Sequence, residues 1–298
     1  TAGNDEQVSL TLAYRPPYDW GYVSAFLGRR AICGVEEVSA SGYARTIRLA
    51  RGHARLHVAP MEGEHALRLQ VSCAEPGDLF EIATTARRVF DLTADPAAIA
   101  AVLSADPVLR PLVIAGPGLR IPGVWDAFEC AVRGVLGERL SVRAARRLTE
   151  RLVQRFGERV AAGAHGLTHV FPSAARLAEA DLTTIGLTPT RSAAVRALAR
   201  AVRDRSLNLS AHAEEVVRAL GAVPGVSAWV VQYVALRALG EPDAFPGGDR
   251  WLRRLSRARR SPPRTVAGLE RRARAWRPWR GYATLYLWRR ADGDAAPR

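Results

Sequence analysis

The sequence predicts an α+β fold in which an N-terminal antiparallel sheet with flanking helices precedes a long all-helical region. Apolar residues alternate with period two from Val8 to about Val71, in short runs separated by glycine and proline. Past Asp91 they recur at spacings of three and four almost to the C-terminus, which is the period of amphipathic helices. The 298 residues, 48% of them hydrophobic, are enough to bury a large core.

Within the N-terminal region, the sheet and its helices can be placed from local signals. Asp19 follows a pair of prolines and is a suitable N-cap for a helix over residues 20–30, which would pack on one face of the sheet. A second helix over residues 78–90 closes the region, so we expect an N-terminal domain over residues 8–91. The runs with the alternation of strands are residues 10–14, 43–50, 54–58 and 67–71.

The helical region is expected to begin with a short helix over residues 95–105 and a loop over residues 115–123 in which glycine and proline alternate. A long helix should start near Val124, and glycines toward its end predict a bend before an arginine-rich helix over residues 142–156. The later joints are marked by Pro172, Gly186, Pro189, Gly221 and Pro224.

The charge of the chain indicates a polyanionic partner. The formal net charge is +14, which favours nucleic acid over a membrane surface. All 43 cationic residues are arginine, because the sequence contains no lysine. No lysine side chain is therefore available to form a Schiff base.

Other residue patterns exclude whole classes of function. Cys33, Cys73 and Cys130 lie far apart and form neither a disulfide framework nor a site with the spacing of zinc or iron–sulfur ligands. No run approaches the roughly 18 to 20 apolar residues of a membrane span, and residues 1–30 lack the pattern of a secretory signal. We therefore expect no metal site, no membrane partner and a cytoplasmic location.

The most informative stretch contains two helices joined by a tight hairpin. An amphipathic helix over residues 213–220 is followed by the hairpin of residues 223–227, and a second helix continues over residues 228–239. The turn exposes backbone N–H groups at the start of the second helix, where the macrodipole also favours an anion, so we expect a DNA phosphate to bind there. The residues predicted to contact the DNA backbone are Pro224, Gly225, Val226, Ser227 and Ala228.

A loop rich in glycine and proline follows that second helix. Residues 245–249 have the sequence FPGGD, which places Asp249 immediately before a helix expected over residues 250–255. Taken alone, such an aspartate is most simply an N-cap. Its position after a helix-hairpin-helix reverses that preference and favours a catalytic role for Asp249.

This order of hairpin, loop and single aspartate resembles that of the helix-hairpin-helix superfamily of base-excision DNA glycosylases. From about Leu10 to Trp288 the chain resembles the AlkA type, 3-methyladenine DNA glycosylase II. The stretches that carry the resemblance, besides the hairpin and its loop, are residues 14–20, 118–123, 126–129 and 276–283.

The resemblance implies that the helical region is a two-lobed, all-helical helix-hairpin-helix glycosylase core. A central helical domain over residues 121–244 would contain the hairpin. A second lobe, formed by residues 92–120 and 245–298, would carry Asp249 and the C-terminal helices.

The resemblance also implies a monofunctional DNA glycosylase that flips alkylated bases, of the 3-methyladenine and 7-methylguanine type, out of duplex DNA. Breaking the N-glycosidic bond leaves positive charge on the sugar, which a carboxylate can stabilise while it orients water. An alkylated purine is already cationic and leaves as a neutral base, so one aspartate suffices without a cofactor. The product would be an abasic site for base-excision repair.

By the same resemblance, Trp229, Tyr233 and Trp288 surround the base pocket. Aromatic faces stack on a flipped base and attract cationic rings, whereas the alternative is that these side chains belong to the core. Some family members have, in place of Trp229, a lysine that attacks the sugar and then nicks the strand. The tryptophan here therefore predicts no lyase activity.

Two positions depart from the family pattern. Ser227 replaces the second hairpin glycine and tolerates positive φ less easily. Glu138 and Arg139 stand where members commonly have glutamine and an apolar wedge, which fills the gap left by the flipped nucleotide. Arg139, with its planar guanidinium, is the wedge candidate.

Two other functions remain open. The chain could be a DNA-binding domain with altered catalysis from a longer repair or regulatory fusion protein, which its non-methionine start allows. It could also be a glycosylase for deaminated bases such as hypoxanthine. In each case we expect a monomer that binds damaged double-stranded DNA in the bacterial cytoplasm, associated with the nucleoid, with room for a monovalent cation at the hairpin.

Overall fold

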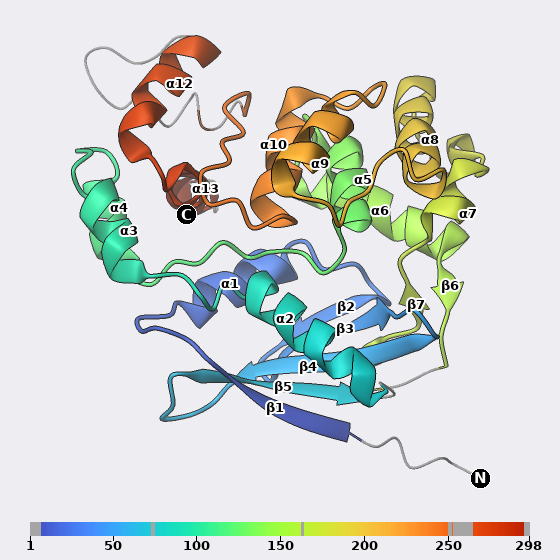
Figure 1. The fold of residues 1–298 in the computed structure, drawn as a ribbon, viewed down its shortest axis with the longest axis horizontal. Coiled ribbons are helices and arrows are strands. Elements are labelled where there is room, and N and C mark those ends of the chain that lie inside the picture. Colours follow the sequence, from blue (N-terminus) through green and yellow to red (C-terminus); the bar gives the residue numbers. More distant parts are fainter. Residues whose placement is uncertain (1–6, 73–74, 162–163, 250–251, 253–264, 295–298) are drawn as a thin grey trace.

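The N-terminal part of the chain is an antiparallel sheet (Figure 1). The computed structural model describes residues 7–72, 75–161, 164–249, 252 and 265–294. The strands are β1 (Gln7–Ala13), β2 (Glu36–Ser39), β3 (Gly42–Arg48), β4 (His53–Pro60) and β5 (Ala66–Ser72). Their order across the sheet is β1-β5-β4-β3-β2. Leu12 of β1 faces Leu67 of β5, so buried side chains meet in register.

Two helices, α1 (Trp20–Gly28) and α2 (Leu79–Val89), cover the face of the sheet that is turned toward the rest of the molecule (Figure 1). Asp19 caps α1 as predicted, because its carboxylate accepts a hydrogen bond of 2.9 Å from the N–H of Tyr22. Val23 of α1 and Ile82 of α2 are buried in one core with the apolar side chains of the strands. The predicted α+β fold with an N-terminal antiparallel sheet is confirmed.

Two groups of helices lie above the sheet in Figure 1, each with its own core. The first group contains α5 (Ala127–Gly137), α6 (Val142–Phe156), α7 (Ala174–Ala178), α8 (Pro189–Arg203), α9 (Ala213–Gly221) and α10 (Ala228–Arg237). The second contains α3 (Pro96–Leu103), α4 (Arg110–Ala115), α12 (Val266–Ala273) and α13 (Arg280–Asp294). Short 3₁₀ helices are η1 (Pro76–Asp78), η2 (Ala164–Gly166), η3 (Leu182–Ile185) and η4 (Arg274–Trp276).

Three expectations need correction. β2 was not predicted, because its sequence EEVS lacks the alternation of a strand. The region expected to be wholly helical contains a small ribbon in which β6 (Glu158–Arg159) pairs with β7 (His169–Val170). The long helix starts at Ala127 rather than near Val124, because Asp126 caps it by accepting a hydrogen bond from the N–H of Glu129.

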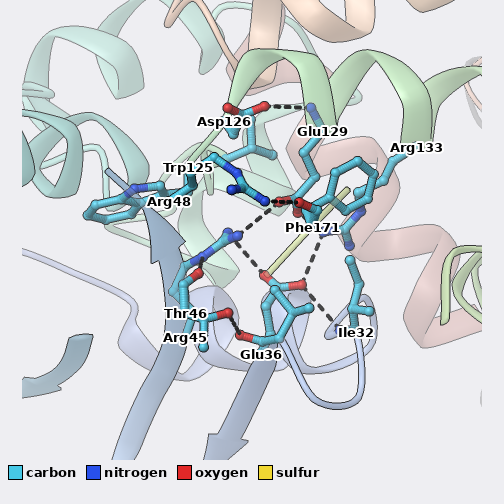
Figure 2. Close-up of polar contacts among 12 residues, drawn as sticks. Ile32, Glu36, Arg45, Thr46, Arg48, Trp125, Asp126, Glu129, Arg133 and Phe171 are labelled. Carbon is cyan, nitrogen blue, oxygen red and sulfur yellow. Dashed lines mark hydrogen bonds and ion pairs between the residues drawn. The ribbon is translucent and has the colours of Figure 1, made fainter. Parts of the chain in front are cut away.

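A cluster of buried charges joins the sheet to α5 (Figure 2). Arg45 of β3 lies 2.9 Å from Glu129 of α5, and Arg133 of α5 bridges Glu36 of β2 and Glu129 at 3.1 and 2.9 Å. Burial alone would raise the pKa of Glu36, but Arg133 and Arg45 outweigh it and hold the pKa below its ordinary value. Because each buried charge is paired, the sheet and α5 are locked together.

Candidate functional site

The hairpin between α9 and α10 is shaped by a glycine and capped by a serine. Gly225 has φ of 82°, and a Cβ built on it would lie 2.6 Å from Cβ of Ala194 on α8. Only glycine fits both this left-handed backbone and this close packing. Ser227 is the N-cap of α10, with its hydroxyl accepting a hydrogen bond of 3.3 Å from the N–H of Val230. Pro224, Gly225 and Ala228 are exposed, so the start of α10 faces solvent.

An aromatic stack occupies the first turns of α10. The rings of Trp229 and Tyr233 are 5.0 Å apart and 16° from parallel, and both side chains are half-buried. The hydroxyl of Tyr233 accepts a hydrogen bond of 2.8 Å from Nη1 of Arg237, whose other donors bind the carbonyls of Pro122 and Gly123. Arg237 is 3% exposed, and it therefore fixes the outer ring of the stack to the chain segment that leads into α5.

The loop that leads from α10 to Asp249 is held from two sides. On the side of α10, the side-chain Oε1 of Gln232 accepts a hydrogen bond of 2.9 Å from the N–H of Phe245. On the side of α13, Arg280 makes two contacts of 2.8 Å with the carboxylate of Asp243. The ring of Phe245 also packs edge-on against Trp276, with the ring centres 6.0 Å apart. These contacts give the loop one defined path.

Asp249 ends this loop beside the aromatic stack. A Cβ built on Gly248 would lie 3.9 Å from Cβ of Trp229, so the end of the loop passes over the first turn of α10. The carboxylate of Asp249 is half-buried, and its Oδ1 accepts a hydrogen bond of 3.0 Å from the N–H of Leu252. The cap expected for an aspartate at this position is thus present. The rest of the helix expected over residues 250–255 lies outside the described residues.

The sequence of this chain matches two family models. Residues 9–126 match the AlkA N-terminal domain, and residues 132–280 match the HhH-GPD superfamily base excision DNA repair protein. The chain belongs to the HhH-GPD superfamily. The hairpin, the loop and Asp249 all lie within the second match.

Three proteins illustrate what this HhH-GPD chain is similar to. It is 39% identical over 284 residues to the probable bifunctional transcriptional activator/DNA repair enzyme AlkA of Mycobacterium tuberculosis, covering 94% of this chain but only 56% of that protein. It is 34% identical over 283 residues to DNA-3-methyladenine glycosylase 2 of Escherichia coli, covering 93% and 96% of the two chains. The solved 3-methyladenine DNA-glycosylase from Archaeoglobus fulgidus shares the fold, with a TM-score of 0.80 at 20% identity over 93% of this chain and 96% of that one.

Ser227 is accommodated in this HhH-GPD hairpin without strain. Its φ of −85° and ψ of 160° are those of extended backbone, so the position does not need the positive φ that we expected a glycine to supply. The serine hydroxyl also gives α10 a cap that glycine lacks. The serine therefore does not have to adopt a positive φ at this position.

The other predicted residues of the HhH-GPD site lie in different places. Trp288 is half-buried on α13 and packs on the core of the second helical group, whereas Trp229 and Tyr233 pack on the core of the first. Among the described residues, no ring contact joins Trp288 to either of them. Arg139 is exposed in the turn between α5 and α6 and has φ of 65°.

Sequence reasoning missed the residues that hold the HhH-GPD loop in place. Gln232 lies on the helix that carries Trp229, and Asp243 and Arg280 are 37 residues apart. A polar residue on an amphipathic helix is usually solvated, so no local signal identified Gln232. The segment 276–283 was singled out by resemblance, and its Arg280 and Gly281 both bind the loop, the N–H of Gly281 donating to the carbonyl of Pro242 at 2.8 Å.

The residues of this HhH-GPD chain that the structure describes contain neither a metal-binding cluster nor a membrane span. Over these residues, no group of three or more histidine, cysteine, aspartate or glutamate side chains is arranged to hold a metal ion. Over the same residues, no helix has the length and apolar character of a membrane span.

Proposed function

We propose that this chain is a monofunctional DNA glycosylase that flips alkylated bases, of the 3-methyladenine and 7-methylguanine type, out of duplex DNA and hydrolyses the N-glycosidic bond. One observation carries the proposal. The loop that ends at Asp249 lies against Trp229, at the start of the second hairpin helix. A carboxylate, an aromatic stack and a helix N-terminus that can bind phosphate are thereby brought together. The names of the Escherichia coli and Archaeoglobus fulgidus relatives support the substrate class.

In the proposed reaction, the bond between the sugar and the base breaks with both electrons leaving on the base. A cationic alkylated purine then departs neutral, and positive charge develops on the sugar. The carboxylate of Asp249 stabilises that charge and orients the water whose oxygen bonds to the anomeric carbon. The proton that this water loses passes to the carboxylate and then to solvent. The half-buried setting of Asp249 strengthens this electrostatic effect relative to open solvent.

The aromatic stack is proposed to select the base. An extruded base can stack on Trp229 and Tyr233, and the negative faces of these rings attract a base that carries positive charge. Trp288 would complete the pocket from the second helical group. A neutral, undamaged purine is stabilised in the pocket by stacking alone. An alkylated purine is stabilised by stacking and by the attraction of its positive charge to the rings, so it binds more tightly.

We expect no lyase step, because the chain lacks the lysine that would act as its nucleophile. Family members that nick the strand use a lysine at the position of Trp229, and this sequence contains no lysine. The proposed product is therefore an intact abasic strand, which breaks only after treatment with alkali.

The hairpin and the arginines are proposed to bind the DNA. The exposed start of α10 offers N–H groups to a phosphate, and a monovalent cation at the hairpin would complete this contact. Arg139 would enter the duplex from the turn between α5 and α6. The net charge of +14 favours DNA of any sequence, which suits a monomer that searches the nucleoid for damage.

A second candidate is a DNA-binding domain with altered catalysis within a longer repair and regulatory protein. The name of the Mycobacterium tuberculosis relative, of which this chain spans 56%, combines a transcriptional activator with a DNA repair enzyme and gives no support to altered catalysis. The two candidates differ in their need for Asp249, since a binding domain does not require that carboxylate.

The experiment uses duplex DNA that contains N-methylated purines, and a second duplex that contains hypoxanthine. The released bases are identified, and strand breaks are scored with and without alkali. Asp249→Asn should lower base release by at least about 100-fold and leave DNA affinity unchanged. Asparagine is as good an N-cap as aspartate, so the contact with Leu252 is kept. Release of hypoxanthine but of no methylated purine, strand breaks without alkali, or an active Asn variant would contradict the proposal.

A further inference from the structure

The turn that carries Arg139 has an unusual backbone. Arg139 is exposed between α5 and α6, and its φ of 65° lies in the left-handed region. Arginine rarely adopts this region, because its Cβ crowds the following carbonyl. The turn has two local backbone hydrogen bonds, from the N–H of Glu138 to the carbonyl of Gly134 and from the N–H of Leu140 to the carbonyl of Gly137, and a contact from another part of the molecule can stabilise it further.

Arg191 supplies such a contact from the first turn of α8. Its Nη2 donates a hydrogen bond of 2.8 Å to the carbonyl of Glu138, which fixes the peptide that joins Glu138 to Arg139. The backbone of Arg191 is fixed in turn, because its N–H donates to the hydroxyl of Thr188, the N-cap of α8. A hydrogen bond from a half-buried cation is among the stronger ones in proteins.

The same part of α8 also touches the hairpin. Ala194 lies three residues after Arg191, on the same helix face, and is the residue against which Gly225 packs. One helix therefore contacts both the Arg139 turn and the hairpin. α8 therefore links these two elements, in addition to the direct packing of Gly134 of α5 on Val230 of α10.

We propose that Arg191 is a positioning residue, which holds the Arg139 turn at a fixed distance from the hairpin so that Arg139 enters the duplex where the flipped nucleotide leaves a gap. The inference rests on the roles of Arg139 and the hairpin in the proposed function. It differs from a simple phosphate contact, which strengthens binding to every duplex alike. Positioning of a wedge strengthens binding only where a base is missing or flipped.

Binding to two duplexes of one sequence tests the inference without requiring base release. One duplex contains a tetrahydrofuran abasic-site analogue and the other is intact. Wild type, Arg139→Ala, Arg191→Met and the double variant are compared, with Arg191→Lys as the conservative replacement. Arg200→Met is the matched control, because Arg200 is exposed on the same helix.

Arg191→Met should weaken binding to the abasic-site duplex by about tenfold, or about 1.4 kcal/mol, and binding to the intact duplex no more than Arg200→Met does. Arg191→Lys should restore most of the loss. Because both residues act through one turn, the double variant should bind the abasic-site duplex no more weakly than Arg139→Ala.

Three results would overturn the inference: additive losses in the double variant, equal losses on both duplexes, or wild-type binding by Arg139→Ala. Base release from alkylated duplex by the wild-type chain is scored separately. A chain that shows the coupling yet releases no base would contradict the proposed function while supporting the role of Arg191.

Discussion

The side chain of Gln232 accepts a hydrogen bond from the backbone N–H of Phe245 at 2.9 Å, so the second hairpin helix itself holds the loop that ends at Asp249. The element that would grip DNA and the element that would perform the chemistry are thereby joined by one side chain. Displacement of either would move the other.

Gln232→Met should lower the rate of base release about tenfold, because it leaves the N–H of Phe245 without its acceptor and loosens the path of the loop. Single-turnover base release and affinity for intact duplex are measured together, and affinity should change less than twofold. Gln154→Met is the matched control, since Gln154 is exposed on α6. An equal fall in rate and affinity would show that Gln232 supports the hairpin instead.

Gly225→Ala should lower both stability and DNA affinity. An alanine is strained at φ of 82°, and its Cβ would lie only 2.6 Å from Cβ of Ala194. We therefore expect the free energy of unfolding to fall by about 2 kcal/mol or more. Gly52→Ala is the matched control, because Gly52 has φ of 80° but no atom within 4 Å of the added Cβ. It should cost about 1 kcal/mol in denaturant unfolding and leave affinity unchanged. Equal effects of the two variants would argue against a close fit of the hairpin on α8.

Trp229→Leu should reduce the release of a cationic base more than that of a neutral one. The ring of Trp229 is stacked on Tyr233 at 5.0 Å, and the attraction of such a surface for a cation is worth about 1 kcal/mol or more. The ratio of single-turnover rates on 7-methylguanine and hypoxanthine should therefore fall about fivefold. An unchanged ratio would assign the ring to packing alone.

Asp91 should make the free energy of unfolding decrease as the pH rises, which is the opposite of the usual effect of a carboxylate. Burial raises the pKa of this carboxyl from its ordinary value of 3.8 to about 6, against the opposing hydrogen bonds from the N–H of Ile121 and the hydroxyl of Tyr282. The folded chain then binds the proton more tightly than the unfolded chain does. The stabilisation from that proton is complete below about pH 4 and is lost as the pH rises through about 6.

Asp91→Asn isolates this effect, because asparagine keeps the acceptor and tolerates the φ of 52°. The free energy of unfolding of wild type minus that of the variant should fall by up to about 3 kcal/mol between pH 4 and pH 7.5. Denaturant titrations over that range measure it. A constant difference would place the pKa of Asp91 near its ordinary value.

Sequence reasoning succeeded where the determining signal is local. The cap at Asp19, the hairpin at Pro224 and Gly225, and the glycines before Asp249 are each set by residues within a few positions of one another. The distinctive spacing of these signals then identified the superfamily before any contact between distant residues was known.

Sequence reasoning failed where the local structure depends on residues that are distant in the sequence. The strand β2 begins with two glutamates, and the buried Glu36 pairs with Arg133, which lies 97 residues later in the sequence. The backbone at Ser227 could not be inferred from a family pattern, because an extended N-cap and a left-handed glycine are equally compatible with a short turn. The contact of Arg191 with Glu138, over 53 residues, has no counterpart in periodicity.

The four charges buried between the sheet and α5 have a mechanical consequence. α5 carries Glu129 and Arg133 and ends at Gly137, just before the turn with Arg139. If Arg139 enters a bent duplex as proposed, the load on it would act on the end of α5, which these ion pairs attach to β2 and β3. The N-terminal sheet would then hold α5 in place against the DNA.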